Sequence, residues 1–220
     1  MFVRDLLKNE IPHLLLSDSI STAIYFFDQH KLKQIPVLGP EGFVGLIDED
    51  SLLDAPETDT IETHKKHLAQ TSIREEQNLF NALNYFSIEK LSILPVIDQE
   101  NRYLGCIHEL DLLVKCCDWL NLKQPGGIIH LEVKNVDYSL SQISQIVEGS
   151  GAKILTCLCL PHSSNLKMLE ILIKINSEEL SGVIQTFERY EYSILASFQK
   201  KIQSTELNDR FDSLIRYLNI

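Results

Sequence analysis

The first half of the chain carries the same pattern of hydrophobic and polar positions twice. Residues 20–38 place hydrophobic side chains at i, i+3 and i+7, which predicts a helix, and a short hydrophobic strand follows. Residues 79–97 repeat this pattern. Identical residues at matched positions include Ala23 and Ala82, Phe27 and Phe86, Lys31 and Lys90, Pro36 and Pro95, and Val37 and Val96. We therefore predict an internal duplication.

Each repeat continues with a turn, a second strand at residues 43–47 or 103–107, and a short helix. One such unit is too small to bury its hydrophobic faces alone, whereas two packed units would share a core. We predict one domain at residues 1–122 with an internal pseudo-twofold axis. Its repeats cover residues 1–55 and 66–120.

A different pattern follows the Gly and Pro residues at 124–127, which mark a domain boundary. The predicted series is a strand at 129–133, a helix at 139–149, strands at 154–160 and 169–175, a helix at 178–189 and a strand at 192–198. This β-α-β-β-α-β order predicts a ferredoxin-like domain at residues 126–199, so the chain as a whole is of the α+β class. A last amphipathic helix is predicted at residues 204–220.

The repeated pattern of the first half resembles the CBS (cystathionine-β-synthase-type) domain, in which a helix is followed by h-P-V-h, a turn and h-G-h-h. In this sequence the motif residues are Ile35-Pro36-Val37 with Gly45, and Leu94-Pro95-Val96 with Gly105. The first half thus looks like a tandem CBS pair. The resemblance implies a sensor that binds an adenosine nucleotide or S-adenosylmethionine and that forms a homodimer.

Residues 126–199, placed after such a pair, resemble an ACT domain, a small regulatory module that often binds amino acids at a dimer interface. The whole arrangement is similar to the acetoin-utilisation accessory proteins. This resemblance implies that both the CBS pair and the ACT-like domain take part in a homodimer.

Composition and charge narrow the range of partners. The 220 residues are 44% hydrophobic and 23% charged, which is typical of a globular protein. The net charge of −11 disfavours nucleic acid and anionic membrane surfaces. We expect a cytoplasmic protein, because no apolar run is long enough for a membrane span and the first residues do not resemble a signal peptide. Five cysteines without disulfide spacing agree with a reducing compartment.

Nucleotide-binding CBS repeats usually carry G-h-h-T/S-x-x-D after the second strand, and repeat two has Gly105-Cys106-Ile107-His108-Glu109-Leu110-Asp111 here. The resemblance assigns Asp111 to the two ribose hydroxyls. His108 replaces the hydroxyl residue, and an imidazole can still donate to a phosphate. The alternative role of Asp111 is that of a first-turn residue favoured by the helix dipole. The predicted ligand site of repeat two comprises Asp111, His108, Ile107, Leu94 and Pro95.

Repeat one departs further from the nucleotide-binding pattern. Ser51 stands at the ribose position and Asp48 at the phosphate position, and Pro36 belongs to the first strand of the same repeat. A carboxylate ~4 Å from one phosphate charge costs about 4 kcal/mol at an effective dielectric constant of ~20. We therefore predict that Asp48, Ser51 and Pro36 do not bind a nucleotide phosphate unaided.

The ACT-like half also departs from its family. Amino-acid-binding ACT domains usually carry a Gly soon after the Asp that ends the first strand, but this chain has Asp137-Tyr138-Ser139. Tyr138 or Ser139 would block or remodel the approach of a ligand. The sequence therefore favours a dimerisation or docking platform, with ligand binding at this loop as the alternative.

No Ser/His/Asp or Cys/His set and no metal-ligand spacing can be assembled from sequence neighbours. We predict a non-enzymatic, allosteric regulatory protein, in which the CBS pair binds a small adenosine-type ligand and signals through the ACT-like domain. The alternative is an oligomerisation scaffold with vestigial clefts that docks an unknown protein partner.

Overall fold

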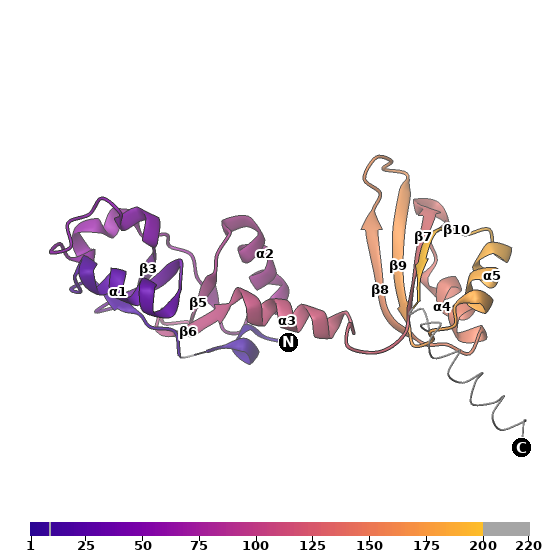
Figure 1. The fold of residues 1–220 in the computed structure, drawn as a ribbon, viewed down its shortest axis with the longest axis horizontal. Helices are drawn as coiled ribbons and strands as arrows, with labels where there is room; N and C mark the ends of the chain where they lie inside the picture. Colours follow the sequence, from indigo (N-terminus) through magenta and orange to yellow (C-terminus); the bar gives the residue numbers. More distant parts are fainter. Residues whose placement is uncertain (9, 200–220) are drawn as a thin grey trace, which may run out of the picture. The chain divides into compact units, whose positions relative to one another are not determined.

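Residues 1–8 and 10–199 are described in the computed structural model, and they divide into two units (Figure 1). The first unit is Met1–Cys116, and the second begins at Cys117. Both combine helices with sheets, as the predicted α+β class requires. The helix predicted at residues 204–220 lies outside the described residues.

The two repeats of the first unit have the same topology. In each, a two-residue strand pairs parallel to the middle strand, which pairs antiparallel to the third. Repeat one consists of β1 (Leu14–Leu15), α1 (Ile20–His30), β2 (Gln34–Gly39), β3 (Gly42–Asp48) and the 3-10 turn η2 (Glu49–Leu52). Repeat two consists of β4 (Ile73–Arg74), α2 (Leu79–Glu89), β5 (Ile93–Ile97), β6 (Tyr103–His108) and α3 (Glu109–Trp119). The sheet orders β1-β2-β3 and β4-β5-β6 confirm the duplication that the sequence pattern predicts.

The matched helices begin and end in the same way. Ser19 and Asn78 cap α1 and α2 by accepting a backbone N–H three residues on. Lys31 and Lys90 end these helices in the left-handed conformation, with φ of 53° and 52°. The closing helices differ, because repeat one has only η2 where repeat two has the eleven-residue α3. Two further 3-10 segments, η1 (Val3–Leu6) and η3 (Ile61–His67), precede β1 and β4.

The turn between β5 and β6 of repeat two forms hydrogen bonds with repeat one. Its Asp98 accepts hydrogen bonds from the backbone N–H groups of Glu100 and Arg102 and from Arg102 Nε. Burial alone would raise the pKa of Asp98, but the hydrogen bonds and charge of Arg102 hold this pKa below its usual range. The ordered turn presents Asn101, whose Nδ2 donates to the Phe43 carbonyl at 3.0 Å and whose carbonyl accepts from the Phe43 N–H at 3.2 Å.

Replacing Gly42 with alanine is expected to destabilise this junction by about 2–3 kcal/mol. Gly42 has a φ of 114°, and an added Cβ would lie 2.3 Å from the Asn101 carbonyl oxygen. Chemical denaturation of the full chain would measure the change. Gly182→Ala is the control, because its added Cβ would meet no atom within 4 Å apart from its chain neighbours and the backbone of its own helix. Equal stability of the two variants would contradict the prediction.

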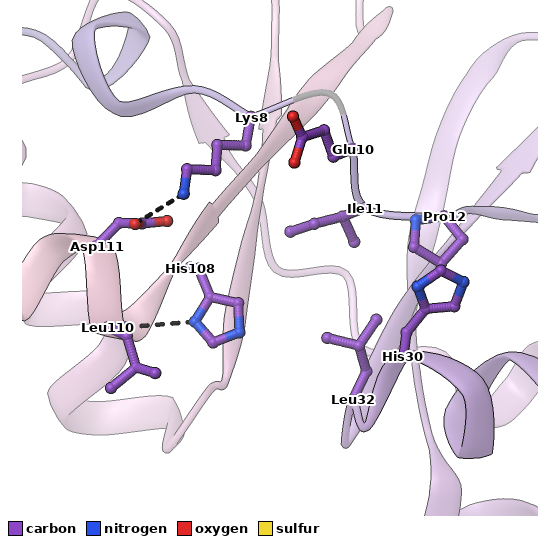
Figure 2. Close-up of a pocket in the computed structure, with 9 residues that line it drawn as sticks. All are labelled: Lys8, Glu10, Ile11, Pro12, His30, Leu32, His108, Leu110 and Asp111. Atoms are coloured by element: carbon purple, nitrogen blue, oxygen red, sulfur yellow. Dashed lines mark hydrogen bonds and ion pairs between the residues drawn. The ribbon is translucent and has the colours of Figure 1, made fainter.

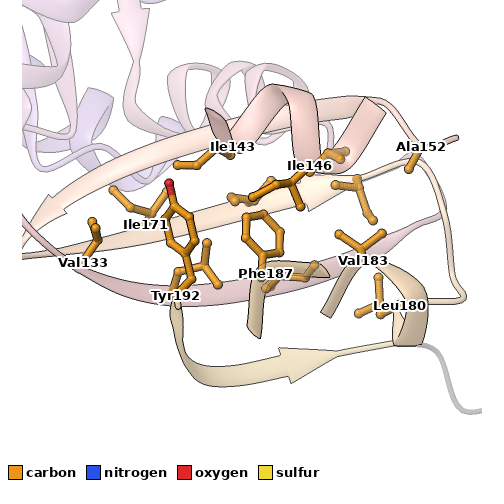
Figure 3. Packing of buried hydrophobic residues seen from close by; sticks show 14 residues of the cluster. Val133, Ile143, Ile146, Ala152, Ile171, Leu180, Val183, Phe187 and Tyr192 are labelled. Carbon is orange, nitrogen blue, oxygen red and sulfur yellow. The ribbon is translucent and has the colours of Figure 1, made fainter. Parts of the chain in front are cut away.

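The second unit is a four-stranded antiparallel sheet with two helices. Its elements are β7 (Gly127–Lys134), η4 (Asn135–Asp137), α4 (Leu140–Gly149), β8 (Ile154–Pro161), β9 (Met168–Ile175), α5 (Ser181–Arg189) and β10 (Ser193–Phe198). The sheet order is β10-β7-β9-β8, which realises the predicted β-α-β-β-α-β series. Alternate residues of β7 and β9 pack against α4 and α5 around the fully buried Phe187 (Figure 3).

Candidate functional site

A cavity of about 370 Å³ lies in the first unit, where both repeats and the N-terminal segment contribute side chains (Figure 2). The N-terminal segment supplies four residues, the end of α1 and the residues after it supply two, and the junction of β6 with α3 supplies three. The lining residues are Lys8, Glu10, Ile11, Pro12, His30, Leu32, His108, Leu110 and Asp111. The site therefore combines residues about 100 positions apart in the sequence.

The N-terminal segment is held against repeat two by its backbone. Val3 is fully buried and donates its N–H to the Gln77 carbonyl at 2.8 Å. Lys8 exchanges two backbone hydrogen bonds with Cys106 of β6, at 2.9 and 3.0 Å. These bonds fix the backbone of Lys8 beside Cys106, which precedes His108 by two residues in β6.

Asp111 forms an ion pair in the cavity. Lys8 Nζ donates to Asp111 Oδ1 at 2.9 Å, with the two side chains 50% and 29% exposed. The hydrogen bond to the Asp111 carboxylate and its charge raise the pKa of the Lys8 ammonium, and the charge of Glu10 adds to this effect. Since the pair is open to solvent, it contributes little to stability. The ion pair matters for ligand binding, because the carboxylate predicted to bind ribose is already paired with the Lys8 ammonium.

His108 is oriented by the first turn of α3. Its Nδ1 accepts the Leu110 backbone N–H at 3.3 Å. In the neutral imidazole the proton is therefore on Nε2, which is left as a hydrogen-bond donor. His108 lies within the cavity beside Asp111 (Figure 2). The cavity thus contains a carboxylate, an ammonium and an imidazole donor, together with apolar surface from Ile11 and Leu32.

The other residues predicted for repeat two lie elsewhere. Leu94 and Ile107 are fully buried, and Pro95 is buried within β5. They pair across the hairpin, Leu94 with Ile107 and Pro95 with Cys106, and they are not among the residues that line the cavity. Their strands, β5 and β6, form the hairpin that ends at His108.

The residues of repeat one are not gathered at this cavity. Pro36 is buried in β2, opposite Leu46. Ser51 donates its hydroxyl to the Asp48 carbonyl at 2.7 Å, across the start of η2. None of the three lines the cavity that contains Asp111.

The loop predicted to matter in the second unit precedes α4. Ser139 caps α4 by accepting the Gln142 N–H at 3.3 Å, and Tyr138 packs against the hydrophobic core. Partial burial raises the pKa of Tyr138 above its usual value. Asp137 lies at a separate cavity of about 430 Å³, together with Gln142 and Tyr192.

Local sequence patterns do not identify several of the residues that line the first-unit cavity. Lys8, Glu10, Ile11 and Pro12 precede the first matched segment, and His30 is the last residue of an ordinary helix. No spacing connects them with Asp111. Lys8 reaches the site because it pairs with Cys106 of β6. This pairing is a tertiary contact, and no local sequence pattern predicts it.

The described part of the chain has neither a cluster of metal-ligating side chains nor a membrane-spanning helix. Among residues 1–8 and 10–199, no group of three or more His, Cys, Asp or Glu side chains is arranged to hold a metal ion. Within the same ranges, no helix has the length and apolarity needed to span a membrane.

Comparison with known proteins bears on the first unit. The sequence pattern of the CBS domain family matches residues 3–58 and 69–116. The chain is similar to a CBS domain pair/ACT domain protein from Thermotoga maritima, with 21% identity and a TM-score of 0.50 over 54% of this chain and 98% of that one. At this level of identity the likeness shows the fold alone.

Two other solved structures are similar to the chain at lower TM-scores. A putative acetoin utilization protein from Vibrio cholerae is 19% identical, with a TM-score of 0.48 over 56% of this chain and 95% of that one. CBSX2, solved in complex with AMP, is 17% identical, with a TM-score of 0.47 over 56% of this chain and 98% of that one. The family match and the duplicated topology agree: the first unit of this chain consists of two CBS domains in tandem.

Proposed function

We propose that this protein is a non-enzymatic regulator whose CBS pair binds an adenosine nucleotide in the cavity formed by the N-terminal segment, the end of α1 and the start of α3. The observation that carries the proposal is the presence of Asp111 and His108 on one cavity that also has an apolar wall. A carboxylate accepts both ribose hydroxyls, and His108 Nε2 donates to a phosphate oxygen. Ile11, Pro12 and Leu32 provide a surface for the base.

Isothermal titration calorimetry of the full chain tests the proposal directly. The panel contains AMP, ADP, ATP, adenosine, S-adenosylmethionine and free amino acids. We expect at least one adenosine phosphate to bind and to raise the melting temperature of the protein. Failure of every adenosine compound to bind at millimolar concentration would reject the proposed function.

The second unit is proposed to be an ACT-like domain that transmits ligand occupancy. Its element order and its β10-β7-β9-β8 sheet support this assignment. Tyr138 occupies part of the space beside the core, and Ser139 is engaged as a helix cap. These contacts favour a platform for assembly over an amino-acid site at residues 137–139.

A homodimer is the proposed assembly. An exposed apolar stripe on α3 supports it and also favours an oligomerisation scaffold as a second candidate function. Leu110, Leu113 and Val114 form a stripe on α3, and their exposed fractions are 60%, 58% and 54%. The spacing i, i+3, i+4 places them on one helical face. Such a face is stabilised when a second copy covers it.

Replacing Leu113 with lysine is therefore expected to shift the protein from dimer towards monomer by more than tenfold in the dissociation constant. Sedimentation velocity of the full chain at several concentrations would measure the shift. Leu53→Lys is the control, because Leu53 is 75% exposed but belongs to repeat one and not to α3. An unchanged dimer in the Leu113 variant would refute this interface. A dimer that binds no nucleotide would favour the scaffold.

A further inference from the structure

The cavity of the CBS pair already contains a cation at the position where the proposed nucleotide would place its ribose. Lys8 Nζ lies 2.9 Å from Asp111 Oδ1, and Figure 2 shows the ammonium reaching the carboxylate from the N-terminal segment. Asp111 Oδ1 therefore accepts a hydrogen bond from Lys8 before any ligand arrives. A ribose hydroxyl that takes the place of the ammonium on this oxygen displaces the Lys8 hydrogen bond.

Displacement leaves Lys8 at the cavity. Its backbone is tied to Cys106 by two hydrogen bonds, so that only the side chain can swing away. The side chain is flexible and half exposed, and its ammonium has three donors. Among the cavity-lining residues, Glu10 would then be the remaining carboxylate available to Lys8. A released ammonium at the site is a point charge that can pair with an anionic ligand group.

The charge of the ligand decides whether this exchange is favourable. A neutral nucleoside breaks the ion pair without giving Lys8 a new partner. S-adenosylmethionine brings a sulfonium cation at the carbon where AMP carries its phosphate, and this cation would lie near the released ammonium. A phosphate supplies the missing anion, and it also accepts from His108 Nε2.

We propose that Lys8 is the specificity-determining residue of this cavity. When the ligand binds, the Lys8 side chain leaves Asp111 to the ribose hydroxyls and pairs with the phosphate. The site therefore selects nucleoside phosphates over nucleosides and over sulfonium nucleosides. This inference rests on the proposed nucleotide-binding function and deepens it. A charged residue 103 positions before Asp111 thereby decides between the two ligand classes that the family resemblance leaves open.

Calorimetry of the wild type, Lys8→Met and Lys8→Arg with AMP, adenosine and S-adenosylmethionine tests the inference. The wild type should bind AMP at least about tenfold more tightly than the other two ligands, since one charge-assisted contact is gained. Lys8→Met should weaken AMP binding about 10- to 100-fold and leave adenosine binding unchanged or slightly tighter. Lys8→Arg should restore the preference for AMP.

Lys66→Met is the matched control, because Lys66 is exposed in η3 and does not line the cavity. Equal losses of AMP and adenosine binding in Lys8→Met would show a merely structural role and would overturn the inference. An unchanged AMP preference in that variant would overturn it as well. Both outcomes are compatible with the proposed function of the wild type, whereas a wild type that binds neither AMP nor adenosine rejects the proposed function and this inference together.

Discussion

Replacing Asp111 with alanine is expected to weaken AMP binding by about 100-fold or more. Two hydrogen bonds to ribose hydroxyls would be lost, and each hydrogen bond to a charged group contributes about 1.5–3 kcal/mol. The loss of the Lys8 ion pair should change stability little, because both side chains are partly exposed. The melting temperature of the unliganded variant should therefore stay close to that of the wild type, while calorimetry shows the weakened binding.

The internal duplication provides a matched control for this variant. Ser51 holds the position in repeat one that Asp111 holds in repeat two, and it donates to the Asp48 carbonyl outside the cavity. Ser51→Ala is expected to leave AMP affinity unchanged. If Ser51→Ala weakened binding as much as Asp111→Ala, the assignment of the nucleotide to the Asp111 cavity alone would be wrong.

Replacing Phe187 with alanine is expected to lower the free energy of unfolding of the second unit by about 3–5 kcal/mol. Phe187 is fully buried among residues of β7, β9, α4 and α5, and its ring meets that of Tyr192 edge-on at a centroid distance of 5.4 Å. Truncation leaves a cavity that the surrounding strands cannot readily fill. Hydrogen exchange of amides in β7 and β9, followed by mass spectrometry, would report the loss as reduced protection.

Phe198 is the control in the same unit, because this side chain is 60% exposed at the end of β10. Phe198→Ala is expected to change stability by no more than about 0.5 kcal/mol. A Phe187 variant as stable as the Phe198 variant would mean that the core described for the second unit is wrong.

The two repeats share a fold but differ in chemistry. Ser19 and Asn78 cap equivalent helices, and Lys31 and Lys90 end them with the same backbone conformation. The last residue of the third strand differs, because repeat one places Asp48 where repeat two places His108. The backbone plan therefore persists while this position changes from an imidazole to a carboxylate.

Local periodicity was sufficient to predict most of the elements. Ile20, Ala23 and Phe27 are buried along α1, and Leu79 and Ala82 are buried along α2, at the spacing that the sequence shows. The alternation in β7 likewise predicts Ile129, Leu131 and Val133 as core residues. These predictions succeed because burial on one face of a helix or strand depends on neighbours a few residues away.

Sequence patterns predicted the duplication, the order of elements in both units and the position of Asp111 and His108 after the second strand predicted for repeat two. The set of side chains that share a cavity depends on tertiary contacts. Backbone pairing with Cys106 brings Lys8 to Asp111, whereas Leu94, Pro95 and Ile107 are buried in the β5–β6 hairpin and do not line the cavity. The physical reason is that periodicity reports the face of an element, whereas a cavity arises where distant elements meet and leave a space between them.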